Sequence, residues 1–148
     1  MSETTYLLDT NIILMLVRGN ELGTHINTRF GLHASKIRPM ICVVTHGEIY
    51  VLARRRGWGD KKIKVLENTL NNLVTVNINH PAVLDAYIEI DLYSQQHPTG
   101  ARNMGKNDLW IAACAKAAGA KLLSTDRDFE HLGDLFAVEY IDPAMVKR

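Results

Sequence analysis

The sequence predicts a three-layer α/β/α sandwich whose central sheet is mostly parallel and has four to five strands. Short apolar runs alternate along the chain with longer segments in which apolar residues recur every three or four positions. Strands that alternate with helices imply right-handed crossovers, which place helices on both faces of the sheet. The 148 residues are the right length for one domain, and no repeat or linker divides residues 1–148.

The first third of the chain predicts two strands and three helices. In order, they are a strand at 6–8, a helix at 12–19, a less regular helix at 20–38, a strand at 40–44 and a helix at about 45–56. The first helix is indicated by apolar residues at helical spacing from Ile12 to Val17. Pro39 separates the second helix from the β-rich run that follows it.

The middle of the chain predicts a helix, a strand and another helix. Gly57–Gly59 breaks the preceding helix, and Asp60 is expected to cap the next one. The valine-rich run at 74–78 predicts the third strand. Pro81 suits the first position of a helix that continues to about His97.

The last third begins with a polar loop at 99–106. An alanine-rich helix follows at 107–118, and Gly119 is expected to end it. Two strands, at 121–124 and 137–141, flank a short turn of helix.

The composition is that of an ordinary globular protein, with 47% hydrophobic and 22% charged residues. No apolar run approaches the ~20 residues that cross a bilayer, and the N-terminus lacks the pattern of a signal peptide. We therefore expect a cytoplasmic protein with no membrane partner. Cys42 and Cys114 lie in apolar segments and suit buried, reduced thiols, while the six histidines show no zinc-binding spacing.

Four acidic residues mark the junctions between predicted elements. Each lies where a strand gives way to a helix or where a helix begins: Asp9, Glu48, Asp108 and Asp126. The carboxyl ends of parallel strands meet at one edge of a sheet, where ligands bind, so we expect these side chains to lie together. Carboxylates crowded at one place repel one another unless a cation or a shared proton intervenes. Because Mg²⁺ and Mn²⁺ prefer oxygen ligands, the leading hypothesis is a metal site that hydrolyses a nucleic-acid backbone.

Each acid also has a structural alternative. Thr45–Glu48 reads as a capping box, in which Glu48 would only satisfy the start of its helix. Asp108 would be favoured by the helix dipole, and Asp126 or Asp128 would cap the short helix after the fourth strand. Asp9 follows buried leucines and needs a partner or a cation to offset its desolvation. The hypothesis therefore depends on the set of four, with polar neighbours available to orient it: Thr10, Asn11, Asn107 and Thr125.

The charge of the remaining surface favours a polyanionic substrate. The net charge is +1, but without the four clustered acids 12 acidic residues remain against 17 basic ones, or about +5. Arg54 and Arg55 begin a basic segment around Trp58 that would hold phosphates while the indole stacks on a base. The alternative is a solvated helix end with the tryptophan packed in the core.

Two further basic residues, Arg102 and Lys106, belong to the loop that leads into Asp108. This loop would carry them to the mouth of the acidic pocket, where they would contact substrate phosphates. An ordinary solvated connection is the alternative.

Four sequence blocks that contain the acids resemble those of the PIN-domain nucleases. Their order, spacing and flanking residues agree, and the likeness extends from Tyr6 to about Phe136. The blocks are Leu7–Ile12, Val44–Ile49, Asn107–Ala113 and Leu123–Phe129. The chain is most similar to the VapC-like toxins of type II toxin–antitoxin pairs.

This resemblance implies a PIN-like fold and an endoribonuclease that depends on Mg²⁺ or Mn²⁺ and hydrolyses RNA phosphodiester bonds. The four acids fall on the family's catalytic and metal-binding positions, and Asn11 and Thr125 fall on its supporting polar positions. Because the position of the last acid varies among relatives, Asp126 and Asp128 can share or exchange that role. The likeness also implies a homodimer and an antitoxin protein encoded nearby, which inserts a residue, often Arg, into the acidic pocket.

Other functional classes agree with parts of the sequence. A catalytically silent module would bind RNA or an antitoxin-like protein and use the acids as caps or counter-charges. A Mg²⁺ enzyme of the topoisomerase-primase type would use Asp126 and Asp128 as a DxD pair, but leaves the acids of the first and third blocks unexplained. A phosphatase of the haloacid-dehalogenase type would need an acid where Asn11 stands.

Overall fold

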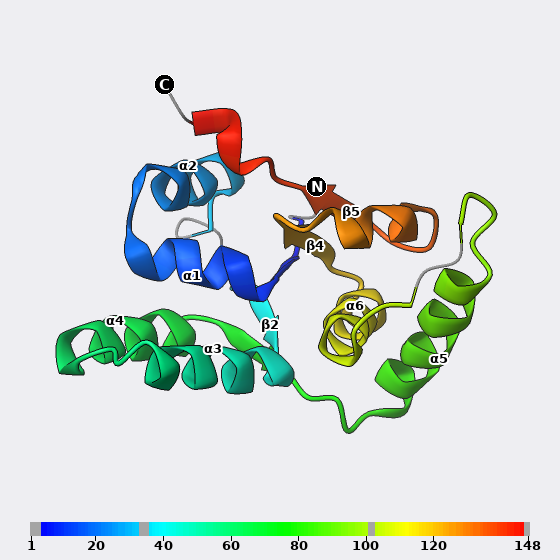
Figure 1. Cartoon of the computed structure of the whole chain (residues 1–148), viewed down its shortest axis with the longest axis horizontal. Coiled ribbons are helices and arrows are strands. Elements are labelled where there is room, and N and C mark those ends of the chain that lie inside the picture. The colour runs from blue at the N-terminus through cyan, green and yellow to red at the C-terminus, as the bar shows by residue number, and fades with distance from the viewer. Residues whose placement is uncertain (1–3, 33–35, 101–102, 147–148) are drawn as a thin grey trace.

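The computed structural model describes residues 4–32, 36–100 and 103–146. Its centre is a five-stranded parallel sheet with the strand order β3-β2-β1-β4-β5 (Figure 1). The strands are β1 (Tyr6–Leu8), β2 (Met40–Cys42), β3 (Val74–Val76), β4 (Lys121–Ser124) and β5 (Val138–Tyr140). The predicted sheet of four to five mostly parallel strands is therefore confirmed.

Eight helical segments surround the sheet in the described part of the chain. The α-helices are α1 (Thr10–Arg18), α2 (Glu21–Phe30), α3 (Val43–Arg55), α4 (Asp60–Asn71), α5 (Pro81–Gln95) and α6 (Lys106–Ala118), and the 3-10 helices are η1 (Arg127–Asp134) and η2 (Pro143–Val146). No helix among the described residues is both long and apolar enough to span a membrane.

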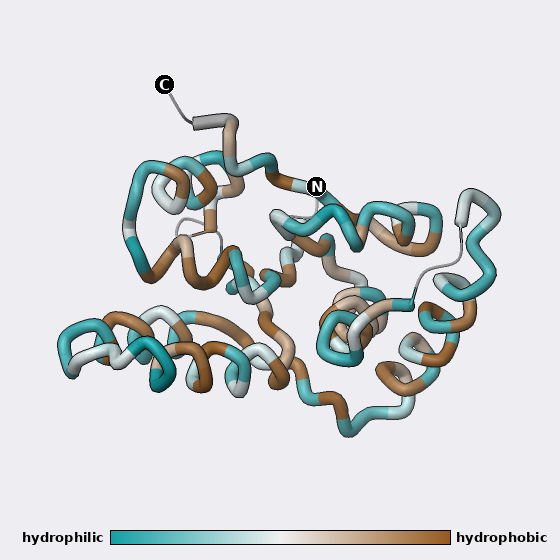
Figure 2. Tube along the Cα trace, viewed as in Figure 1, coloured by the Kyte–Doolittle hydropathy of each residue, from teal (hydrophilic) through white to brown (hydrophobic). Residues whose placement is uncertain are grey.

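The two faces of the sheet are covered by different helices. Leu7 of β1 belongs to a buried cluster that contains Ile111 of α6 and residues of α5. The next residue, Leu8, belongs to a second cluster with Ile13 of α1 and Leu66 of α4. Successive side chains of a strand point to opposite faces, so the sheet is buried on both sides and the three predicted layers are present. In Figure 2 the chain is hydrophobic where it passes through the centre and hydrophilic at the outer tip between α3 and α4.

The strand order contains a switch point at the middle of the sheet. The chain adds β2 and β3 on one side of β1, and then returns to place β4 and β5 on the other side. The two directions of winding leave a crevice at the carboxyl ends of β1 and β4, which is where open α/β sheets bind ligands.

Several of the predicted elements were too long, among them the third strand, which was expected at 74–78 and ends at Val76. The helix expected at 20–38 ends at Phe30, because Gly31 adopts the left-handed conformation (φ 61°) and its N–H donates to the last helical carbonyls. The strand expected at 40–44 ends at Cys42, and Val43 and Val44 already belong to α3. The β-branched pair is helical because α3 packs against the sheet at this point, and packing overrides local propensity.

Two smaller expectations concern a cap and the cysteines. Asp60 is the first residue of α4 and Gly59 is its N-cap, so the predicted capping role of Asp60 is wrong. Cys42 and Cys114 are buried free thiols, as predicted, and their Sγ atoms lie 3.4 Å apart.

Candidate active site

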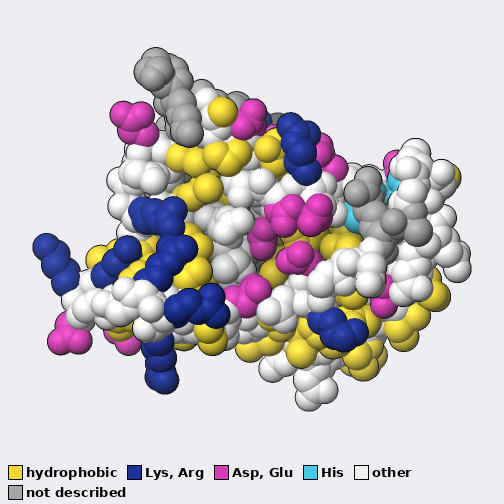
Figure 3. Space-filling model, in the orientation of Figure 1, with side chains coloured by type: hydrophobic (Ala, Val, Ile, Leu, Met, Phe, Trp, Pro, Cys, Tyr) yellow, Lys and Arg dark blue, Asp and Glu magenta, His cyan; other side chains and the backbone are white. Residues whose placement is uncertain are grey.

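All four predicted acids line one pocket of about 600 Å³ at the carboxyl ends of β1 and β4. Thr10, Asn11 and Asn107 line the same pocket. In Figure 3, acidic side chains gather at the centre of one face, in the region where α1, α3 and α6 meet in Figure 1. The structure therefore brings together residues that are up to 117 positions apart, counted from Asp9 to Asp126.

Asp9 follows β1 directly and is only 5% exposed. Its Oδ1 accepts from the Thr10 N–H (2.7 Å) as the N-cap of α1, and its Oδ2 accepts from the Ser124 hydroxyl (2.7 Å). Burial raises its pKa from 3.8 to about 6, against the lowering effect of both hydrogen bonds, and the charges of Glu48 and Asp126 raise it further. Asp9 thus caps a helix, yet its ionised form is destabilised by burial and by its acidic neighbours.

Glu48 holds three helices together at the pocket. Its Oε1 accepts from the Thr10 hydroxyl of α1 (2.6 Å), and its Oε2 accepts from the Asn107 amide of α6 (3.1 Å). The capping-box alternative is wrong, because α3 begins at Val43 and its N-cap is Cys42, which places Thr45 inside the helix. The side chain of Glu48 is therefore directed to the pocket by contacts with α1 and α6.

Asp108 lies in the first turn of α6, after the N-cap Gly105. Burial raises its pKa from 3.8 to about 6, and the charges of Asp9, Asp126, Glu48 and Asp128 add to the effect, in that order. Its place in the first turn agrees with the dipole alternative. However, a carboxylate that only stabilised a helix start would have a lowered pKa. The raised pKa of Asp108 shows that burial and neighbouring negative charges outweigh the helix dipole.

Asp126 and Asp128 occupy different positions. Asp126 lines the acidic pocket, and its Oδ1 accepts from the Asp128 N–H (2.9 Å) as the N-cap of η1. Asp128 lines an adjoining hollow of about 200 Å³ together with Asp108. The predicted capping role of Asp126 is confirmed, and Asp128 lies beside the pocket rather than in it.

Ser124 is the site residue that the sequence did not reveal. It is fully buried at the end of β4, where its hydroxyl donates to Asp9 and its Oγ accepts from the Asp126 N–H (2.9 Å). Thr125, the predicted supporting residue, makes no side-chain hydrogen bond to any described residue, whereas Asn11 lines the pocket as expected. The available signal was a polar residue at the end of a strand, directly after two leucines.

The predicted basic residues are divided by the structure. Arg55 lines the acidic pocket, whereas Arg54 and Lys106 are exposed and do not. Arg102 lies outside the described residues. Trp58 packs against the buried cluster that contains Leu8, and the Lys62 ammonium lies 4.2 Å from the centre of its ring. This agrees with the alternative in which the tryptophan packs in the core.

The donor set at the pocket is made of oxygen and matches a hard divalent cation. Among the residues that the structure describes, the hydrogen-bond partners of buried Asp9 include no cationic side chain, so none of these partners compensates the charge of its ionised form. Within the described ranges, no group of three or more carboxylate, imidazole or thiolate side chains is arranged to hold one ion. Mg²⁺ commonly takes one or two carboxylates and keeps several waters, so Asp9 with one of its neighbours suits such an ion.

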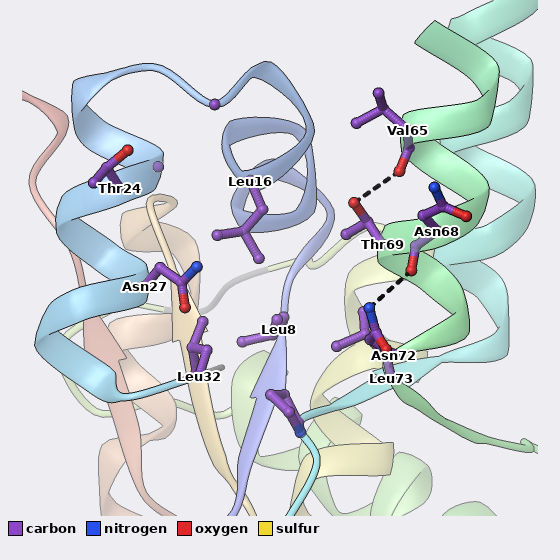
Figure 4. A pocket seen from close by; sticks show the side chains of 13 residues that line it. Leu8, Leu16, Thr24, Asn27, Leu32, Val65, Asn68, Thr69, Asn72 and Leu73 are labelled. Atoms are coloured by element: carbon purple, nitrogen blue, oxygen red, sulfur yellow. Dashed lines mark hydrogen bonds between the residues drawn. The ribbon is translucent and has the colours of Figure 1, made fainter. Parts of the chain in front are cut away.

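A second cavity, of about 370 Å³, lies between α2 and α4 (Figure 4). Thr24 and Asn27 of α2 face Asn68, Thr69 and Asn72 of α4 across it, and leucines close its base. None of the described residues that line it is ionisable. Its described lining therefore offers no carboxylate, imidazole or thiol for acid–base chemistry or metal binding.

Comparisons with known proteins agree with this architecture. Residues 6–135 match the family model of the PIN domain. A chain of VapBC2 from Rickettsia felis, solved with a fragment of promoter DNA, superposes with a TM-score of 0.77 at 20% identity and covers 94% of this chain and 100% of that one. A search of curated protein sequences gives no significant match.

Two further solved structures have the same fold. DNA-bound VapBC from Salmonella typhimurium has a TM-score of 0.71 at 20% identity, and VapBC-1 from nontypeable Haemophilus influenzae has a TM-score of 0.71 at 22% identity. Each covers 93% of this chain and 98% of its own. Since the family model spans most of the sequence, the chain belongs to the PIN domain family, whose members are generally nucleases.

Proposed function

We propose that the protein is a Mg²⁺- or Mn²⁺-dependent endoribonuclease and the VapC-like toxin of a toxin–antitoxin pair. The observation that carries this proposal is the convergence of Asp9, Glu48, Asp108 and Asp126 in one pocket with Arg55 at its margin. Four carboxylates in one pocket attract divalent cations, and a basic side chain beside them attracts the phosphates of a nucleic acid.

A bound Mg²⁺ or Mn²⁺ would neutralise the phosphodiester, activate water and stabilise the departing oxygen. Asp9 and Asp108 hold such an ion only when deprotonated, so their raised pKa values make its binding depend on pH. Thr10, Asn107 and Ser124 keep the acids oriented through hydrogen bonds to Glu48 and Asp9. Asp126, which also lines the pocket, would contribute its carboxylate to holding the ion.

The proposed partners are RNA, an antitoxin and a second copy of the chain. The structures with the same fold are VapBC complexes, which pair a toxin with its antitoxin, and the sequence resemblance implies the same pairing and a homodimer here. Such an antitoxin would place a basic residue among the acids of the pocket, which need a positive charge.

The test is cleavage of total RNA by the purified protein with and without Mn²⁺, followed by mapping of the cut ends. We expect endonucleolytic cleavage only with the metal, and loss of cleavage in Asp9→Asn, which keeps an amide able to cap α1. Asp91→Asn is the matched control, since this aspartate lies on α5 and contacts Gln95. Full Mn²⁺-dependent activity of Asp9→Asn would contradict the assignment. An unchanged thermal midpoint with Mn²⁺ and no cleavage would favour the silent binding module instead.

A further inference from the structure

One wall of the acidic pocket is apolar. Leu14 of α1 and Val51 and Leu52 of α3 line the pocket beside the carboxylates, and we call these three residues the apolar shelf. Val51 is 57% exposed, more than any other exposed large hydrophobic side chain in the described part of the chain. A single exposed valine is common on a protein surface. An apolar shelf that is exposed at Val51, half-buried at Leu52 and buried at Leu14, beside carboxylates, is different, because it offers a contact for the uncharged part of a ligand.

The two shelf residues of α3 belong to an ordered series of side chains along that helix. Glu48, Val51, Leu52 and Arg55 line the pocket, and their spacing places them on one face of the helix. At 1.5 Å per residue, the backbones of Glu48 and Arg55 are separated by roughly 10 Å along the axis. Along this face a carboxylate is followed by apolar side chains and then by a guanidinium.

Arg55 is available to a ligand. It makes no ion pair with any described residue, whereas Arg29, Lys116 and Lys121 are each paired with a glutamate. In Figure 3, lysine and arginine side chains gather over α3 and α4 on one side of the acidic centre. A polyanion that leaves the acids in this direction meets positive charge. The alternative is that Arg55 only complements the C-terminal dipole of α3. In that case, substitution of Arg55 would not affect substrate binding.

We propose that this face of α3 is the subsite for the nucleotide next to the cleaved bond. The base of that nucleotide lies on the apolar shelf, and its outer phosphate is held by Arg55. This assignment rests on the proposed nuclease function and adds the residues that position the strand. It requires an unpaired base, because a base that is stacked and paired in a duplex cannot lie on the shelf.

The first experiment measures cleavage of a single-stranded RNA and of the same RNA annealed to its complement. We expect Arg55→Gln to raise KM about tenfold, leave kcat unchanged and reduce the salt slope of binding by about one. Arg18→Gln is the matched control, since Arg18 is also exposed in the last turn of its helix and does not line the pocket. The duplex is expected to be a poor substrate for the wild type.

The second experiment tests the shelf with an abasic substrate. Nucleotides on either side of the cleaved bond are replaced one at a time by an abasic residue, and kcat/KM is measured for the wild type and for Val51→Ser. One abasic position should lower wild-type kcat/KM about tenfold and should lower that of Val51→Ser far less, because the contact is already lost. Val65→Ser, an exposed valine on α4, is the control.

The outcomes separate this inference from the function on which it rests. If no RNA is cut with Mn²⁺, the proposed nuclease function fails and the subsite fails with it. If RNA is cut but Arg55→Gln matches Arg18→Gln, the role of Arg55 is refuted. If RNA is cut and no abasic position affects the wild type more than Val51→Ser, the shelf does not hold a base and only this inference is overturned.

Discussion

At the scale of single residues, the acidic pocket is organised by hydroxyl groups that stand between the carboxylates. Ser124 joins Asp9 to the backbone of Asp126, and Thr10 joins α1 to Glu48. The Ser124 hydroxyl lowers the pKa of Asp9, against the burial and the like charges that raise it. The protonation state of Asp9 therefore depends on a neutral neighbour.

Ser124→Ala should weaken the metal site without removing a carboxylate. Without the donated hydrogen bond, the pKa of Asp9 rises further above about 6, so the acid limb of the pH–rate profile should move to higher pH. Affinity for Mn²⁺ should fall roughly 10- to 100-fold. Ser94→Ala is the control, since Ser94 is another fully buried serine with a hydrogen bond, to His131. An unmoved acid limb in Ser124→Ala would contradict this role.

The raised pKa of Asp9 also has a consequence for stability. Between pH 3.8 and about 6, the folded carboxyl holds a proton that the unfolded chain has already lost, so this group makes unfolding easier as the pH rises through that window. The full effect, up to about 3 kcal/mol, is present above about pH 6.

Urea unfolding in EDTA at several pH values measures this effect. The stability of Asp9→Asn relative to the wild type should increase from pH 4 to pH 7, and Mn²⁺ should reduce the difference by stabilising the ionised wild type. A difference that does not change with pH would show that the burial of Asp9 is not the cause.

The predictability of the site differs from residue to residue. Glu48 lies inside α3 and Asp108 follows a loop after α5, so the ends of strands do not explain their convergence, which the resemblance to the PIN-domain blocks indicated. Asp9 and Asp126 could be predicted from the fold, because each follows a parallel strand and such strands end at one edge of the sheet. Ser124 could not, because its role depends on the pairing of β4 with β1, and its partner Asp9 is 115 residues away. Local sequence shows Ser124 only as the last residue of a strand.

At the scale of elements, the start of α3 shows where sequence patterns fail. The run Met40–Val44 has uniform β-propensity, but the chain changes from strand to helix inside it, at Val43. The packing of α3 against the sheet overrides this propensity, and Glu48, further along the helix, accepts hydrogen bonds from α1 and α6. The end of α6 before Gly119 (φ 65°) was predicted correctly, whereas the end of α2 before Gly31, which has the same left-handed conformation, was missed.

The contact between α1 and α2 depends on Gly23. A Cβ at this position would lie 2.2 Å from the Met15 carbonyl oxygen, so Gly23→Ala would force the two helices apart. We expect a loss of about 1–3 kcal/mol in the free energy of unfolding, measured by urea titration. Gly47→Ala, in α3, is the matched control, because its Cβ would meet nothing within 4 Å, and it should stabilise the protein by up to about 1 kcal/mol. Equal stability of the two variants would refute the close contact.

At the scale of the whole molecule, opposite charges are separated over one face. The acids occupy its centre, and basic side chains gather over α3 and α4 (Figure 3). Without a cation, the acids at the centre repel the phosphates of RNA, while the basic side attracts them. A divalent ion bound at the centre would replace that repulsion by attraction.

RNA binding should therefore depend on divalent ions even when no cleavage occurs. With an RNA made uncleavable by a methylenephosphonate linkage at the mapped cut site, in which the departing oxygen is replaced by CH₂ and the negative charge is kept, Kd should be about tenfold or more weaker in EDTA than in Ca²⁺. The dependence should largely disappear in a variant that combines Asp9→Asn with Asp108→Asn, which removes two of the negative charges. Fluorescence anisotropy measures both, and equal affinity of the wild type in EDTA and Ca²⁺ would contradict the separation of charges.

The strand order has a consequence for synthesis of the chain on the ribosome. The central strand β1 is made first, but its neighbour β4 ends at Ser124, and the last acid of the pocket is Asp126. A growing or prematurely terminated chain that stops before this point leaves one edge of β1 unpaired and lacks part of the acidic centre. If the pocket cleaves RNA, translation itself delays that activity until synthesis has passed Asp126, 117 residues after Asp9.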